Sequence, residues 1–299
     1  MAPVKNPQTL GSLLLLLTAM IWGTAFAFQR VGMDEIEPFT FTAARMALAA
    51  LAVGGMALAR AKRLPKEEKR RAETLRGGLC CGVFLAAASL FQQAGLVYTT
   101  AGKAGFLTAM YILLVPVLGV VFLKRKERLL TWLAVLLGVG GLYLLCAREG
   151  LRLARGDALV CICALLFSGH ILCCDHFSRR ADPVALSAIQ FAVTAAAALV
   201  LALLTERPSL RQLRAAALPI LYCGLISGGL GYTLQMLAQR FTDPTVASLL
   251  MSLESVFAVL AGALLLHERM SGREALGCAI LFAATLLVQL PEKKKQTAP

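Results

Sequence analysis

The sequence has few charged residues, since Asp, Glu, Lys and Arg make up 16% of its 299 residues, against about 25% in an ordinary soluble domain. Cysteine is also sparse, with an odd count of nine, which argues against a secreted disulfide scaffold. Disorder is excluded because 58% of the residues are hydrophobic. A soluble core stops growing near ~250–300 residues, so this much apolar surface calls for a lipid environment.

The chain also lacks the short motifs of several enzyme classes. It has no Walker A loop to hold ATP phosphates, no HExxH zinc motif and no GxSxG nucleophile elbow. Asp175 and His176 fall at a predicted helix end rather than inside a membrane pocket. We therefore expect no enzymatic activity, no cofactor and no coupling to ATP hydrolysis on this chain.

Long uncharged runs fill most of the remaining sequence. A membrane-spanning helix needs about 20 apolar residues. Two apolar runs, 38–59 and 244–267, carry one charge each, Arg45 and Glu254. The pattern predicts an all-α integral membrane protein with ten transmembrane helices, the other eight in the uncharged runs 6–29, 77–102, 104–123, 129–147, 158–174, 183–205, 215–239 and 275–291.

The net charge of +13 is a topology signal on this interpretation. Of the 30 Lys and Arg residues, 19 fall on the side that holds both termini, ten fall on the other side, and Arg45 lies within a helix. Cytoplasmic loops carry the excess of Lys and Arg, so we expect a multi-pass cell-membrane protein with both termini in the cytoplasm. The basic stretch 60–76 fits a loop near anionic lipid, and no nucleic-acid partner is predicted.

The two halves of the sequence resemble each other. The segment from Pro38 to Arg45 aligns with Pro183 to Gln190 at an offset of 145, and Gln92 aligns with Gln235 at an offset of 143. Residues 1–150 and 151–299 are therefore predicted to be two repeats of five helices each. Because five is odd, the second repeat must enter the membrane from the opposite face, an arrangement typical of transporters with a site at the midplane. The alternative is that apolar helices resemble one another by composition.

Several motifs resemble one transporter family, the EamA family within the ten-helix drug/metabolite transporter superfamily. They are Trp22-Gly23-Thr24, Pro38 to Arg45, Lys103 to Thr108 with Val115-Pro116-Val117, Gly156-Asp157, and Leu253 to Ala258. The resemblance covers nearly the whole chain and implies export of amino acids or related compounds. The sequence departs from the family at Ser255, where members often have Pro, and at His267, where they often have Gly.

Glu254 is the strongest candidate site residue. It lies about midway along an apolar run, and a charge at the bilayer centre costs at least ~2.5–3.5 kcal/mol. The carboxyl should therefore face a wet cavity or a partner, either as a cation or proton site or as a protonated group that bonds two helices. Its counterpart in the first repeat is Tyr111 or Val115.

Other polar groups at membrane depth complete the predicted substrate-binding or coupling set, which is Glu254, Tyr111, Trp22, Gln92, Gln235 and His170. A mid-helix tryptophan either stacks on a substrate or fills a packing gap. Buried amides need hydrogen-bond partners, so the two glutamines either line a cavity or bond neighbouring helices. The glycines at 228–231 allow close helix packing or loosen the helix.

Arg45 and its repeat counterpart Gln190 are predicted to be structural or gating residues. Arg45 lies seven residues after Pro38, roughly 10 Å along a helix. It could line the cavity or pair with Asp34, Glu35 or Glu37.

His170, Cys173, Cys174 and His176 are soft ligands of the kind that zinc or copper prefers. No second cluster completes four ligands, so no metal site is predicted.

The sequence as a whole predicts a secondary-active transporter that exports a small polar metabolite by alternating access, with Glu254 as the proton-coupling residue. A channel, a structural membrane protein and an intramembrane enzyme are the alternatives. The expected partners are the substrate, protons and the lipid bilayer, and the oligomeric state is left open.

Overall fold

The computed structural model describes residues 7–62, 68–99, 101–146, 155–265 and 271–290. It is 87% helix, with no strand in the described ranges. The helices of the first half are α1 (Pro7–Glu35), α2 (Pro38–Ala61), α3 (Glu68–Leu96), α4 (Ala101–Thr108), α5 (Tyr111–Leu123) and α6 (Leu129–Cys146). The second half contains α7 (Arg155–Ser178), α8 (Pro183–Thr205), α9 (Leu210–Ala215), α10 (Ala217–Leu221), the π-helix η1 (Tyr222–Tyr232), α11 (Thr233–Ala238), α12 (Pro244–Met251), α13 (Glu254–Leu265) and α14 (Gly272–Val288).

The helices have the length and composition of membrane spans. Within the described residues, seven spans are long and apolar enough to cross a membrane, and 129–145 and 244–260 form shorter apolar helices. Large apolar side chains point outward from several helices, including Leu51, Phe122 and Leu204. Outward apolar side chains on this scale are suited to lipid, so the chain is a multi-pass membrane protein. The count of ten helices stays a prediction.

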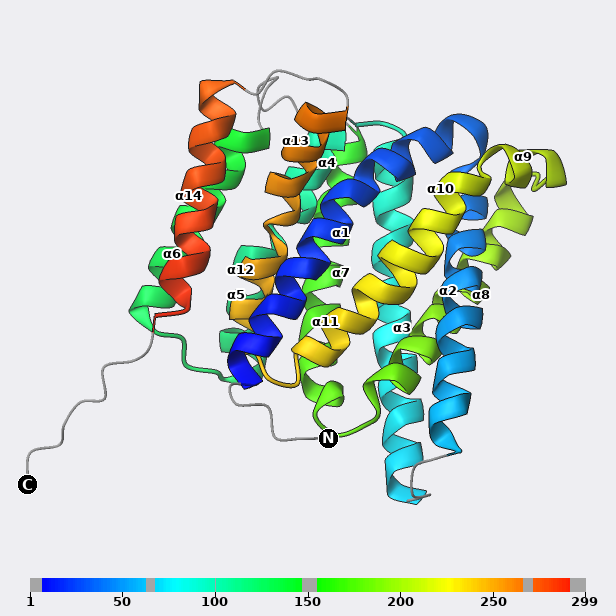
Figure 1. Ribbon diagram of the computed structural model, residues 1–299, viewed down its shortest axis with the longest axis horizontal. Helices are drawn as coiled ribbons and strands as arrows, with labels where there is room; N and C mark the ends of the chain where they lie inside the picture. Colours follow the sequence, from blue (N-terminus) through cyan, green and yellow to red (C-terminus); the bar gives the residue numbers. More distant parts are fainter. Residues whose placement is uncertain (1–6, 63–67, 100, 147–154, 266–270, 291–299) are drawn as a thin grey trace, which may run out of the picture.

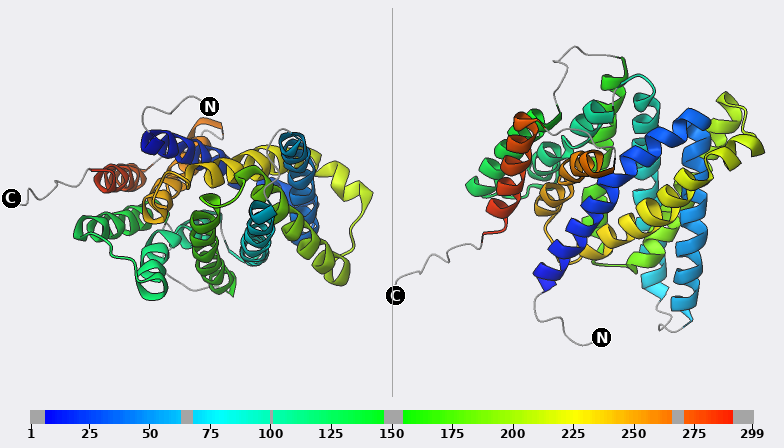
Figure 2. Two further views of the ribbon diagram at one scale, coloured as in Figure 1. Left: turned by 90° about the horizontal axis from the view of Figure 1, so that it is seen from below. Right: turned by 45° about the horizontal axis from the view of Figure 1, so that its top comes forward.

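The helices form a bundle whose two edges are helix pairs that are distant in sequence. At one edge α6 packs along α14, and at the other α2 packs along α8, while α1 lies beside η1 and α11 (Figures 1 and 2). The α6–α14 contact is backbone to backbone, because a Cβ atom at Gly141 would lie 2.9 Å from the Gly277 carbonyl oxygen. Small residues permit such close approach of membrane helices.

Three of the apolar runs are interrupted, where continuous helices were the expectation. The run 104–123 breaks at 109–110 between α4 and α5, and 244–267 breaks at 252–253 between α12 and α13. Backbone hydrogen bonds tighten to the i→i−3 pattern there, for example Met110 to Leu107 and Ser255 to Ser252, both at 3.2 Å. The run 215–239 contains η1. These interruptions place helix ends inside the bundle.

Helix starts explain the paired proline motifs of the two halves. Pro38 and Pro183 are the first residues of α2 and α8, where the missing N–H costs nothing. Asp182 caps α8 with its own side chain. The start of α2 is capped from the other half, because Glu206 accepts hydrogen bonds from the backbone N–H of Phe39 and Thr40 at 2.8 and 2.7 Å.

Candidate functional site

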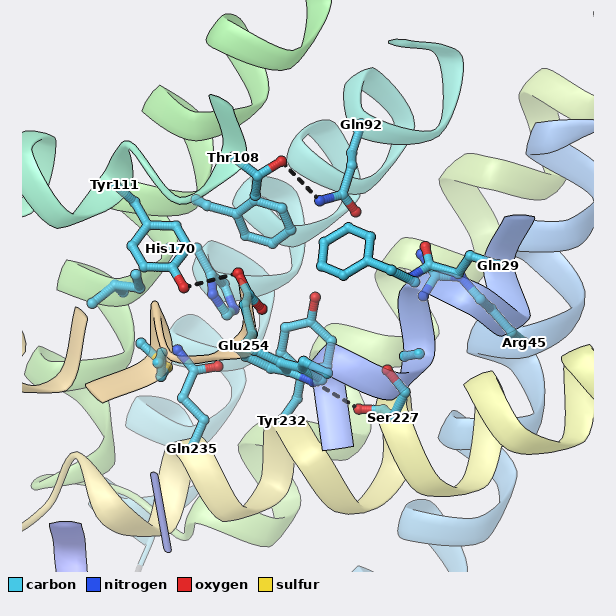
Figure 3. Close-up of a pocket in the computed structure, with 16 residues that line it drawn as sticks. Gln29, Arg45, Gln92, Thr108, Tyr111, His170, Ser227, Tyr232, Gln235 and Glu254 are labelled. Atoms are coloured by element: carbon cyan, nitrogen blue, oxygen red, sulfur yellow. Dashed lines mark hydrogen bonds between the residues drawn. The ribbon is translucent and has the colours of Figure 1, made fainter. Parts of the chain in front are cut away.

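A polar pocket lies between the interrupted helices and their neighbours (Figure 3). Its cavity volume is about 40 Å³, room for about three water molecules at ~10–15 Å³ each. In this conformation it therefore admits only a small polar group. The lining residues come from both halves of the chain and are Trp22, Ala25, Phe26, Gln29, Arg45, Gln92, Thr108, Tyr111, Phe167, His170, Ile171, Ser227, Tyr232, Gln235, Met251 and Glu254.

Glu254 and Tyr111 meet at the two helix breaks. Tyr111 begins α5 and Glu254 begins α13, and the tyrosine hydroxyl donates a hydrogen bond of 3.0 Å to the carboxyl oxygen Oε1 (Figure 3). Glu254 is 4% exposed. The sequence predicted that Glu254 lies in the middle of one continuous helix. This is wrong in detail, because the run is broken at 252–253 and Glu254 is the first residue of α13. The partial positive charge of a helix N-terminus favours a carboxylate there.

α1 holds Glu254 in place through Gly23. A Cβ atom on this glycine would lie 2.5 Å from the Glu254 carbonyl oxygen and 2.8 Å from the Ala258 nitrogen. Backbone therefore packs directly on backbone, and only glycine fits. Trp22, the neighbouring residue, lines the pocket.

The π-helix η1 packs directly against α1 and forms part of the pocket wall. Trp22 donates its indole N–H to the Ser227 carbonyl at 3.1 Å, and its ring lies 4.7 Å from that of Tyr232. The Cβ of an alanine at Gly231 would lie 2.6 Å from the indole nitrogen. The glycine-rich stretch thus allows close packing on Trp22, as one of the two expectations had it; that it loosens the helix stays a prediction.

The two matched glutamines both line the pocket, and each has a local partner. Gln92 donates to the Thr108 hydroxyl at 3.2 Å. Gln235 donates to Gln239 at 3.1 Å, and Gln239 donates in turn to the Ile171 carbonyl at 3.0 Å. The Gln235 carbonyl oxygen is buried without a partner. Gln92 therefore both lines the cavity and bonds α3 to α4, whereas Gln235 lines the cavity and bonds only to the C-cap residue of its own helix, α11.

His170 lies on the pocket wall and contacts Gln190. The ring nitrogen Nε2 is 2.9 Å from the Gln190 side-chain oxygen and 3.4 Å from the Cys174 sulfur. Gln190 itself does not line the pocket. His176 points elsewhere, 3.0 Å from Arg180. Within the described residues, no group of three or more His, Cys, Asp or Glu side chains is arranged to hold a metal ion.

Arg45 reaches the pocket from α2 and is 3% exposed. The acidic residues 34, 35 and 37, offered above as partners, are exposed, and none is paired with it in the described structure. Its guanidinium lies over the Phe41 ring at 5.9 Å. Glu37 instead accepts a hydrogen bond from the backbone of Arg207.

Four polar lining residues were not singled out from the sequence, namely Gln29, Thr108, Ser227 and Tyr232. Two of them carry a helical signal. Gln29 lies seven residues after Trp22, two turns along one helix face, and Tyr232 lies three before Gln235. The spacing i, i+3 and i+7 from residues already chosen was sufficient to find these two.

Charged groups join the two halves at one end of the bundle. Asp175, in the last turn of α7, accepts hydrogen bonds from Arg125 at 2.6 Å and from Arg179 at 2.9 Å. Arg125 also lies 3.7 Å from Asp243. We call Arg125, Asp175, Arg179 and Asp243 the ionic cluster. It lies at the end of the bundle where α1 begins, because a Cβ atom at Gly11 would meet Thr242.

A family profile matches the chain twice. The profile of the EamA-like transporter family covers residues 9–147 and 154–290. The chain belongs to the EamA-like transporter family.

Curated EamA relatives are transporters by name. An "Uncharacterized transporter" of Archaeoglobus fulgidus is 28% identical over 277 residues, with 92% of this chain and 84% of that protein aligned. "Uncharacterized transporter YwfM" of Bacillus subtilis is 28% identical over 306 residues, 96% of each chain. A crystal structure matches with a TM-score of 0.77 at 19% identity, over 93% of this chain and 96% of that chain, which supports the fold alone.

Membership in the EamA family fits the pocket described above. The EamA-like family is a transporter family, and the chain is a membrane transporter by family. The names of the relatives give no substrate. The pocket is therefore the feature that indicates which substrate this protein carries.

Proposed function

We propose that the protein is a secondary-active carrier that exports a small polar metabolite, such as an amino acid or related compound, by alternating access around the pocket. The observation that carries this proposal is the meeting of Tyr111 and Glu254 at two helix breaks inside one buried polar pocket. Discontinuous helices that face each other at membrane depth are the usual framework of carrier substrate sites.

Glu254 is the proposed coupling residue. Its neighbours in the pocket include neutral hydrogen-bonding groups, Tyr111 among them. A carboxyl in such a site can hold a proton when no cation is present, and can release it when a substrate ammonium takes its place. The proton and the ammonium group each carry one positive charge, so exchanging one for the other leaves the net charge at the carboxyl unchanged. The same residue therefore accounts for proton coupling or for direct contact with an ammonium group.

The two halves, residues 1–150 and 151–299, are proposed to be inverted repeats that rock against each other, within a ten-helix fold. The ionic cluster supports this mechanism because Arg125 comes from the first half and Asp175 and Asp243 from the second. Ion pairs across the halves would hold that end shut while the other end opens. A structural or gating role for Arg45 and Gln190 was the expectation from sequence; the ionic cluster is an alternative gate.

The ionic-cluster end is proposed to face the cytoplasm of the cell, together with both termini. Single cysteines at Lys62 and Arg207 in a Cys-less background test this orientation. An impermeant thiol reagent should label position 207, but not 62, in intact cells. The reverse pattern would overturn the orientation. Lys293 and Arg152, two other residues that the charge rule assigns, lie outside the described residues.

The carrier proposal is tested by flux in proteoliposomes. A carrier shows saturable uptake and counterflow, in which unlabelled substrate inside drives entry of labelled substrate. Amino acids and related compounds are the substrates to screen first, with an imposed pH gradient. Flux that does not saturate and shows no counterflow would favour the channel alternative. Absence of flux for the whole class would remove the substrate proposal.

A further inference from the structure

Arg45 is a buried cation at the edge of the pocket. Arg45 is the eighth residue of α2, and only 3% of it is exposed. Its guanidinium carbon Cζ lies over the Phe41 ring, 5.9 Å from the ring centroid. The Nε atom, on the edge of the guanidinium, is buried without a hydrogen-bond partner. This edge therefore has a donor that is left to bind something.

The protein itself provides no anion for this group in the described structure. None of the described carboxylates forms an ion pair or hydrogen bond with Arg45. Glu254 lines the same pocket, but its carboxyl is hydrogen-bonded to Tyr111. A buried charge without a partner is strongly destabilising, and arginines at membrane depth mark substrate or ion pathways for this reason.

Gln29 provides a second unsatisfied group on this side of the pocket. Its side-chain oxygen is buried without a partner, and Gln29 and Arg45 lie together on the right of Figure 3, away from Tyr111. Tyr232 lines the same pocket and is drawn between Glu254 and Arg45 in Figure 3. One ligand could therefore touch both ends.

We propose that Arg45 binds the carboxylate of the transported molecule. The unpartnered Gln29 oxygen is an acceptor, so it would take a hydrogen bond from a donor group of the same molecule and not from the carboxylate. The substrate class is then a small carboxylic acid or a zwitterion, which rests on the proposed carrier function. The planar edge of a guanidinium matches a carboxylate with two parallel hydrogen bonds. The cavity volume of about 40 Å³ suits a group of that size better than a bulky one. Arg45 thus becomes a specificity-determining residue in place of the structural or gating role expected from sequence.

Binding to the purified full-length protein tests the assignment without any transport. The probes are propionate (an anion), L-alanine (a zwitterion) and L-alaninamide (a cation without the carboxylate), with chloride and inorganic phosphate as simple anions. Wild type is compared with Arg45→Lys, which keeps the charge but loses the planar edge, and with Arg45→Gln. Arg60→Gln is the matched control, because Arg60 lies on the same helix with its side chain 54% exposed.

We expect propionate or L-alanine to raise the Tm of the wild type and of Arg60→Gln, and L-alaninamide to have no effect. Affinity should fall at least about tenfold in Arg45→Lys, a variant whose unliganded Tm reports whether it is folded. The proposal is overturned if no carboxylate probe binds the wild type, if L-alaninamide or the simple anions bind as well as the carboxylates, or if folded Arg45→Lys binds within about threefold of wild type. Failure of flux with normal carboxylate binding would instead reject the carrier function.

Discussion

The two helix breaks have similar backbones and different chemistry. Each begins a half-helix with a polar side chain in the pocket, Tyr111 at the start of α5 and Glu254 at the start of α13. The tyrosine is a hydrogen-bond donor that stays neutral at any ordinary pH, whereas the glutamate can exist with or without charge. One half thus supplies a fixed group and the other a group that can switch. This asymmetry, rather than the shared backbone, is what a coupled carrier needs.

Glu254→Gln should have the largest effect, because it removes the switch and keeps the shape. Glutamine can still accept the hydrogen bond from Tyr111, so the variant should insert and fold normally. It cannot ionise, so pH-driven accumulation in proteoliposomes should be abolished. Substrate exchange survives if the role is proton coupling alone, and binding weakens by about 1.5–3 kcal/mol if the carboxylate touches an ammonium group. Net flux and a pH profile like those of wild type would leave Glu254 a structural residue.

Gly23→Ala tests whether the second break must be held in one position. The new methyl group would lie 2.5 Å from the Glu254 carbonyl oxygen, and such overpacking costs about 1–3 kcal/mol. We expect a lower Tm and loss of most transport. Gly54→Ala in α2 is the matched control, because nothing lies within 4 Å of its added Cβ. Equal Tm and flux in both variants would mean that the contact with α1 is dispensable.

Tyr111→Phe should have a smaller effect, because the fixed donor is lost but the switch remains. A hydrogen bond contributes about 0.5–1.5 kcal/mol net, so transport should fall by about three- to tenfold and keep its pH dependence. Tyr143→Phe is the control, since that ring is 42% exposed. If Tyr111→Phe abolishes accumulation as fully as Glu254→Gln, the two breaks do not differ in the way described above.

Glu127→Gln should have the smallest effect, because Glu127 lies outside the pocket. There it links the segment after α5 to α12. Glu127, just after α5, accepts a hydrogen bond of 2.8 Å from Thr245 in α12. Partial burial raises the pKa of the Glu127 carboxyl above its ordinary value of 4.5, and the nearby Asp243 adds to the increase. The folded state therefore favours the protonated acid, and this stabilisation is lost as the pH rises through the raised pKa.

The Tm of Glu127→Gln relative to wild type should therefore increase as the pH rises from about 4 to 7. Purified protein in detergent is sufficient for this measurement. Glu35→Gln, at an exposed position, supplies the baseline for removal of one carboxyl. A Tm difference that stays flat or falls with pH would contradict the sign.

Much of the pocket could be predicted from the sequence because charges and amides are costly in a lipid environment. That single argument selected Glu254, Arg45, Gln92 and Gln235, and all four line the pocket. It failed for groups that are inexpensive in any helix, such as the hydroxyl of Thr108 and the backbone carbonyl of Ser227. No composition signal distinguishes these from ordinary packing residues.

The helix breaks could not be predicted for a related reason. The break before Glu254 contains neither Pro nor Gly, but Ser252 and Leu253, and the change lies in the backbone, which moves from i→i−4 to i→i−3 hydrogen bonds. Local sequence says little about such an exchange, which neighbouring helices stabilise. Apolar periodicity located the run 244–267 and could not divide it.

The π-helix η1 has a consequence for which single-residue deletions the protein can tolerate. An α-helix turns about 100° per residue. Deletion of one residue from η1 would therefore turn the residues after it, Gln235 among them, by roughly that angle relative to the residues before it. Single-residue deletions here should therefore be as damaging as a substitution in the pocket itself, and an alignment gap between distant relatives at η1 would mark a change in what the pocket presents.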